Sequence, residues 1–65
     1  MTLKTFIKNL VNPEEYAPEA IALAYLLECS PAEAKKIPIE AAPCSVEKFN
    51  NLTIEADQIL SDISI

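Results

Sequence analysis

The stretch between residues 20 and 27 reads Ala20-Ile21-Ala22-Leu23-Ala24-Tyr25-Leu26-Leu27. A helix built from this stretch is apolar on every side, whereas a helix at a protein surface keeps one polar face. Such a helix has to be covered all round, either by the rest of the chain or by a second molecule. We expect a helix over Pro18–Cys29 that lies at the centre of the fold or pairs with a second copy.

The chain has 65 residues and no glycine, which limits the turns that it can form. Tight β-hairpin turns prefer Asn-Gly, Asp-Gly or Gly-X pairs, and none is available. Helices commonly end on a glycine in the left-handed conformation. Here we expect them to end on asparagine or to be cut by one of the five prolines. Since the length allows one domain, the sequence predicts a single small all-α domain over residues 1–65.

Two amphipathic helices are predicted on either side of the central one. Over Leu3–Val11, apolar residues recur at i, i+3, i+4, i+7 and i+8, and Thr2 is placed to cap the start. Over Val46–Asp62 the apolar residues form a near-heptad stripe, with Ser45 as the cap. The pair Asn50-Asn51 interrupts that pattern and leaves open whether the last helix is continuous. Together these segments predict a bundle of three main helices.

Short helical turns are predicted at Pro13–Tyr16 and Pro31–Ile37, because each follows a cap residue, Asn12 or Ser30, and begins with a proline and a glutamate. The core is predicted from the apolar stripes. Its members are Leu3, Phe6, Ile7, Leu10, Ile21, Leu23, Ala24, Leu27, Ile37, Val46, Phe49, Leu52, Ala56, Ile59 and Leu60.

The charge and hydropathy of the chain exclude several kinds of partner. Ten acidic and five basic residues give a net charge of −5, which repels nucleic-acid phosphates and anionic lipid. No apolar run is long enough to span a membrane. Lys8 and Asn9 interrupt the apolar residues of the N-terminus, which is therefore unlike a signal peptide. We expect a cytoplasmic protein. A reducing compartment favours Cys29 and Cys44 as free thiols over a disulfide between them, and the sequence leaves that choice open.

The residue inventory is poor in catalytic groups. The chain has no histidine, which removes the commonest general base and the commonest metal ligand. A phosphate-binding loop needs glycine. The thiols of Cys29 and Cys44 have no histidine to activate them. We expect no enzymatic activity, no cofactor and no metal.

Residues 20–37 resemble a helix-turn-helix motif, with Cys29-Ser30 as the turn between a longer and a shorter helix. The resemblance implies DNA binding through the second helix. That helix carries only Lys35 and Lys36 as cations and is stopped by Pro38. The acidic charge of the whole chain opposes this alternative.

Ser45, at a predicted helix start, resembles the serine that bears phosphopantetheine in acyl and peptidyl carrier proteins, which are small, acidic and helical. The carrier pattern is Asp-Ser-Leu, and here the triplet is Cys44-Ser45-Val46. The resemblance implies a carrier protein, and the adjacent cysteine implies a thiol protein as a related alternative.

The leading hypothesis is a non-enzymatic regulator that binds a protein, of the inhibitor, immunity-factor or adaptor type. Its acidic surface would steer it toward a basic surface on the partner. A homodimer through residues 20–27 is the other interaction that the apolar helix allows. The candidate binding residues are Tyr25, Leu26 and Glu28 on the central helix and Glu55, Asp57 and Asp62 on the last one.

Overall fold

A computed structural model describes residues 2–63, and every regular element in this range is helical. The elements are α1 (Leu3–Lys8), η1 (Pro13–Glu15), α2 (Pro18–Leu27), α3 (Pro31–Ala34), η2 (Ile39–Ala41) and α4 (Val46–Ile63). The prediction of an all-α fold is confirmed. The prediction of three main helices is only partly right, because α1 has six residues, whereas α2 has ten and α4 has eighteen.

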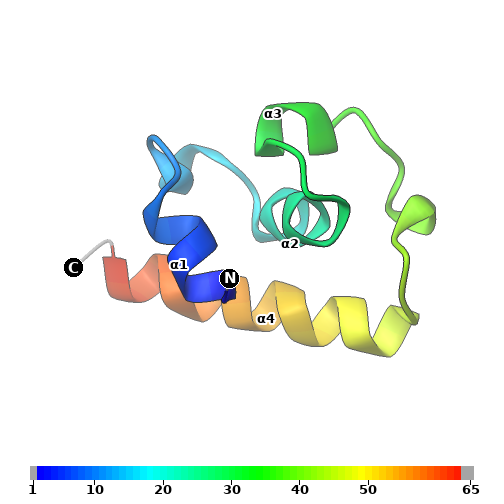
Figure 1. Cartoon of the computed structure of the whole chain (residues 1–65). Helices are drawn as coiled ribbons and strands as arrows, with labels where there is room; N and C mark the ends of the chain where they lie inside the picture. Colours follow the sequence, from blue (N-terminus) through cyan, green and yellow to red (C-terminus); the bar gives the residue numbers. More distant parts are fainter. Residues whose placement is uncertain (1, 64–65) are drawn as a thin grey trace.

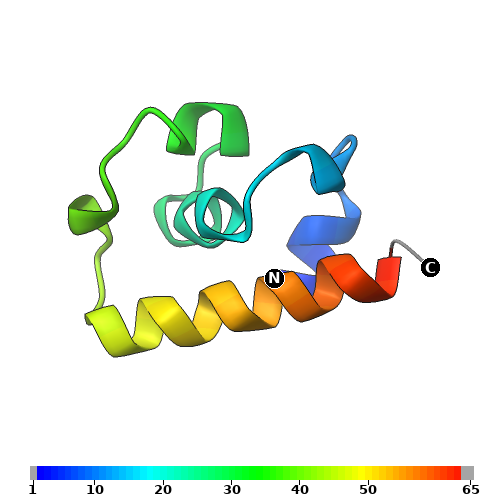
Figure 2. The ribbon, with the colours of Figure 1, turned by 180° about the vertical axis from the view of Figure 1, so that it is seen from behind.

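α2 lies at the centre of the molecule. α4 lies along one side of the molecule, and α2 crosses it at a steep angle. Figure 1 therefore looks down the axis of α2, whereas α4 lies across the picture. α1 and α3 complete the cover, and α2 contacts all three of these helices (Figure 2). Residues Ile21 to Ala24 are at most 1% exposed. The chain's own helices therefore cover the middle of the apolar stretch.

Small side chains fill the places where the helices approach one another. Ala22 and Ala24 of α2 and Ala34 of α3 belong to one buried cluster, which also holds Leu23 and Phe49. A second cluster joins α1, α2 and α4. Phe6 and Leu52 pack against both clusters, so they connect the two into one core. Alanine at these positions allows the close helix approach that larger side chains would prevent.

The predicted core is correct except at its edges. Eight of its members are buried, namely Leu3, Ile7, Ile21, Leu23, Ala24, Phe49, Ala56 and Leu60. Six are half-buried, namely Phe6, Leu10, Leu27, Ile37, Leu52 and Ile59. The prediction for Val46 is wrong, because this residue is 78% exposed: the first turn of α4 projects beyond α2 (Figure 1). Ala22 and Ala34 are buried although they were not predicted.

α1 ends at Lys8, three residues before the predicted end at Val11. Its last turn tightens at Leu10: the N–H of Leu10 donates to the carbonyl of Ile7, three residues back, so the i→i−4 pattern stops before Val11. The residue before a proline is also disfavoured in the helical region. Asn12 instead adopts the left-handed conformation, with φ 52°, and it makes no side-chain cap bond to η1. Val11 is left 82% exposed on the connecting loop.

α2 ends at Leu27, two residues before the predicted end at Cys29. Glu28 takes the left-handed conformation, with φ 56°. The backbone N–H groups of Glu28 and Cys29 both donate to the carbonyl of Ala24, which satisfies an acceptor that the helix end leaves open. The expectation that helices end on asparagine or proline is wrong here, because a glutamate occupies the usual glycine position.

The serine and threonine caps are confirmed. The hydroxyl oxygens of Thr2, Ser30 and Ser45 accept the N–H groups of the residues three positions later, at 3.2, 3.3 and 3.2 Å. The predicted turns are shorter than expected, since η1 ends at Glu15 and α3 ends at Ala34. Beyond α3 the chain continues as turns up to Ile37-Pro38.

α4 is continuous through Asn50 and Asn51 and runs one residue beyond the predicted Asp62. The hydroxyl of Thr53 donates to the carbonyl of Phe49 at 3.0 Å inside the helix. The possible break is therefore absent, because Thr53 bonds back to the preceding turn and does not start a new helix.

The left-handed Glu28 predicts a stabilising substitution. A residue with a Cβ atom pays a steric cost in this conformation that glycine does not. We expect Glu28→Gly to raise the free energy of unfolding by about 0.5–1 kcal/mol, measured by denaturant unfolding. The matched control Glu55→Gly, in the exposed interior of α4, should lower it by about 1 kcal/mol. Destabilisation by Glu28→Gly would contradict the left-handed helix end.

The alanine packing around α2 predicts an overpacking penalty. Ala22 is fully buried, so Ala22→Leu should lower the free energy of unfolding by about 1–3 kcal/mol. Ala20 lies on the same helix beside a surface hollow, and Ala20→Leu should change it by less than about 0.5 kcal/mol. Equal effects of the two substitutions would show that α2 is not enclosed as described.

Candidate functional site

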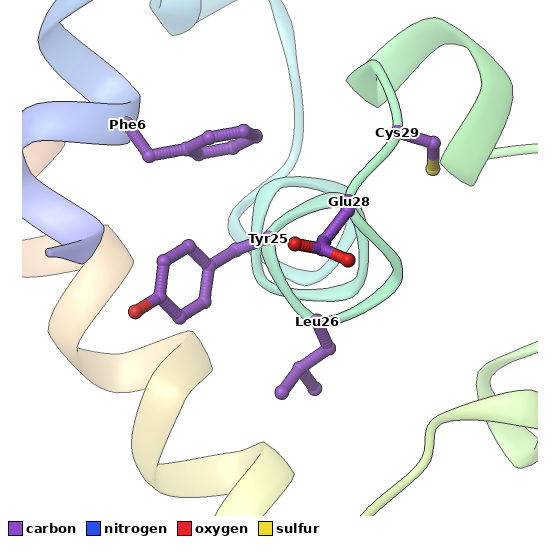
Figure 3. A pocket seen from close by; sticks show the side chains of 5 residues that line it. All are labelled: Phe6, Tyr25, Leu26, Glu28 and Cys29. Carbon is purple, nitrogen blue, oxygen red and sulfur yellow. The ribbon is translucent and has the colours of Figure 1, made fainter. Parts of the chain in front are cut away.

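An open hollow lies at the C-terminal end of α2. It has a volume of about 530 Å³ and is lined by Phe6, Tyr25, Leu26, Glu28 and Cys29. We call it the α2-end hollow. Figure 3 shows Tyr25 and Leu26 projecting from the last turn of α2, with Phe6 reaching toward them from α1. Three of the six predicted site residues, Tyr25, Leu26 and Glu28, therefore share one hollow.

The aromatic wall of the α2-end hollow is built by α1 and α2 together. The ring centroids of Phe6 and Tyr25 are 5.7 Å apart and their planes meet at 66°, an edge-to-face arrangement. Both side chains are half-buried, so each has one side in the core and another toward the hollow. Sequence reasoning placed Phe6 in the core only, because its spacing marks the apolar stripe of α1. The contact with α2 is non-local and leaves no signal in that spacing.

The rim of the hollow is negatively charged. Glu28 is exposed and follows directly on the last turn of α2, which contains no basic residue. The carbonyl groups at a helix C-terminus carry partial negative charge, and the carboxylate of Glu28 adds to it. Cys29 is a half-buried free thiol whose side chain is turned toward α3 (Figure 3). An apolar wall beside a negative rim suits a group that is both apolar and cationic.

The three predicted acidic residues of α4 do not form one patch. All are exposed, but at about 100° per residue Asp57 lies about 160° around the helix from Glu55. Glu55 and Asp62 share a flank. Asp62 lines a hollow together with Lys4 and Lys8 of α1. None of the three lines the α2-end hollow.

Lys35 and Ser45, on which the DNA-binding and carrier-protein alternatives depend, both make contacts within the fold. α3, the second helix of the helix-turn-helix comparison, has four residues, and the Lys35 ammonium lies 5.6 Å from the ring centroid of Tyr16. Ser45 caps α4 through the N–H of Lys48. Cys44 is a half-buried free thiol. These surroundings give a local structural reason for Lys35 and for Ser45.

Residues 2–63 contain neither a cluster of metal-binding side chains nor a helix that could span a membrane. This range holds no group of three or more histidine, cysteine or acidic side chains close enough to bind a metal ion. None of its helices combines the length and the apolar character that crossing a membrane requires. No protein-family model matches this sequence, and no curated protein or solved structure does either.

The edge-to-face pair predicts a measurable coupling. Phe6→Leu and Tyr25→Leu each remove one ring, and the double variant completes a thermodynamic cycle. We expect a coupling free energy of about 0.5–1.5 kcal/mol, measured by denaturant unfolding. Strictly additive losses would mean that the two rings do not stabilise each other.

Proposed function

We propose that this protein is a non-enzymatic regulator that binds another protein, of the inhibitor, immunity-factor or adaptor type. The observation that supports this best is the α2-end hollow, where Tyr25, Leu26 and Phe6 surround an open space. Protein interfaces are centred on aromatic and aliphatic side chains that fill pockets of this kind. In this proposal an apolar side chain of the partner enters the hollow between Phe6 and Leu26.

The partner carries a basic surface in this proposal. The net charge of the chain is −5, and Glu28 adds a carboxylate at the rim of the hollow. Complementary charge accelerates encounter and makes binding weaken with salt. Glu55, Asp57 and Asp62 contribute to this steering from a distance, since none of them lines the hollow. Glu28 is the acidic residue that contacts the partner.

A different protein, not a second copy, is the partner that we propose. The sequence allowed a homodimer because residues 20–27 needed cover, and α1, α3 and α4 supply that cover for Ile21 to Ala24. A symmetric dimer through the α2-end hollow would bring two Glu28 carboxylates together, which disfavours it. The cytoplasmic location expected from the sequence is part of this proposal.

The proposal is tested by affinity capture followed by reconstitution. The immobilised protein is exposed to an extract of cells that produce it, and the retained protein is then purified and titrated by calorimetry. Leu26→Ser and Glu28→Lys should each weaken binding about tenfold or more. The control Ile54→Ser changes an exposed isoleucine of α4 and should bind as the wild type does. The charge control Glu55→Lys changes an exposed glutamate of α4 and should weaken binding far less than Glu28→Lys does, because Glu55 acts only at a distance.

Two readouts keep this test decisive. Leu26 is half-buried, so circular dichroism should first show that Leu26→Ser is folded, and the exposed Glu28 gives a variant without that risk. Binding should also change the activity of the purified partner. An adaptor would instead join that partner to a second retained protein. Equal affinity for Glu28→Lys and the wild type, or a partner that shows neither response, would refute the proposal.

A further inference from the structure

A second hollow lies at the opposite end of α2. It has a volume of about 330 Å³, and its lining includes Glu19 of α2, Ile39 and Glu40 of η2, and Val46 and Phe49 of α4. A smaller hollow of about 190 Å³ adjoins it and shares Glu19 and Ile39. We call the two hollows together the η2–α4 groove. Its two adjoining compartments suit a peptide segment that places more than one side chain better than they suit a single side chain.

Bulky apolar side chains are left uncovered in this groove. Ile39 is 51% exposed and Val46 is 78% exposed, and both line the same hollow beside the buried Phe49. Val46 is the first member of the apolar stripe of α4. Later members such as Phe49, Ala56 and Leu60 are buried by the other helices. The apolar stripe of α4 therefore extends past the part of α4 that the other helices cover. The groove lies where that cover ends.

The charge of the groove defines what can cover it. Glu19 and Glu40 both contribute to its lining. Lys35 lines only the smaller, adjoining hollow, and its ammonium lies over the ring of Tyr16. A second copy related by two-fold symmetry would bring the Glu19 and Glu40 carboxylates of both copies together, and like charges oppose such pairing. A basic occupant would neutralise them.

We infer that the η2–α4 groove docks a segment of a partner protein that carries bulky aliphatic side chains next to a lysine or arginine. The aliphatic side chains pack on Ile39, Val46 and Phe49, and the cation lies beside Glu19 and Glu40. This inference goes beyond the function proposed above, because it concerns the other end of α2. α2 has ten residues and is about 15 Å long, so the two sites can be occupied at the same time.

Peptide selection tests the inference without knowledge of the partner. A phage-displayed library of random dodecapeptides is selected on the immobilised full-length protein, and the enriched peptides are synthesised and titrated by fluorescence anisotropy. We expect peptides that combine leucine, isoleucine or phenylalanine with an adjacent lysine or arginine. Their affinity should fall about tenfold or more in Val46→Asp and in the double variant Glu19→Gln/Glu40→Gln.

The variants are chosen to keep the fold intact. Val46 is exposed, and an aspartate at the first position of α4 is favoured by the helix dipole, so Val46→Asp should remain folded by circular dichroism. Ile54→Asp changes an isoleucine of α4 that is 57% exposed and lies outside the groove. It is the matched control and should leave the affinity unchanged.

Each other outcome overturns the inference in a recognisable way. Failure to enrich any peptide, or enrichment of peptides without a basic residue, removes the proposed occupant. Peptides whose binding survives Val46→Asp but is lost in Leu26→Ser belong to the α2-end hollow, which would support the first proposal and reject this one. A wild-type dimer in sedimentation that Val46→Asp dissociates would make a second copy the occupant.

Discussion

Around its middle, at Ile21 to Ala24, α2 is apolar and buried on every side by three other helices, and the arrangement of the chain follows from that burial. α4, a helix of eighteen residues, covers one side of α2. α1 and α3 have six and four residues, too few to be stable as isolated helices, so they depend on their contacts with α2. Alanines at the contacts let the backbones approach. The cover reaches the middle of α2 but not its ends, and an open hollow lies at each end.

The lack of glycine links the fold to the candidate site. Helix ends that need a left-handed residue normally use glycine, and this chain places Asn12 and Glu28 in that conformation. Glycine at position 28 would relieve the steric cost but would remove a carboxylate from the rim of the α2-end hollow. Strained residues of this kind concentrate at functional sites. The proposed function gives a reason for a charged residue at a position where stability alone favours glycine.

Local signals in the sequence predicted much of the fold. The continuous apolar run located α2, the spacing of apolar residues located α4, and the Thr2, Ser30 and Ser45 caps located three helix starts. The errors lie where distant parts of the chain decide the outcome. Val46 fits the apolar stripe of α4, but the spacing of that stripe does not show how far along α4 the other helices extend. The apolar run and its closing glutamate indicated Tyr25, Leu26 and Glu28, whereas Phe6 and Ile39 join their hollows only through tertiary contacts.

Native-state hydrogen exchange tests most directly whether this chain alone buries α2. The amides of Ile21 to Ala24 should exchange only through global unfolding, with protection equal to the free energy of unfolding. That protection should stay constant when the protein is diluted over a wide concentration range. Fast exchange of these amides would show that α1, α3 and α4 do not bury α2, and protection that falls on dilution would show that a second copy covers it.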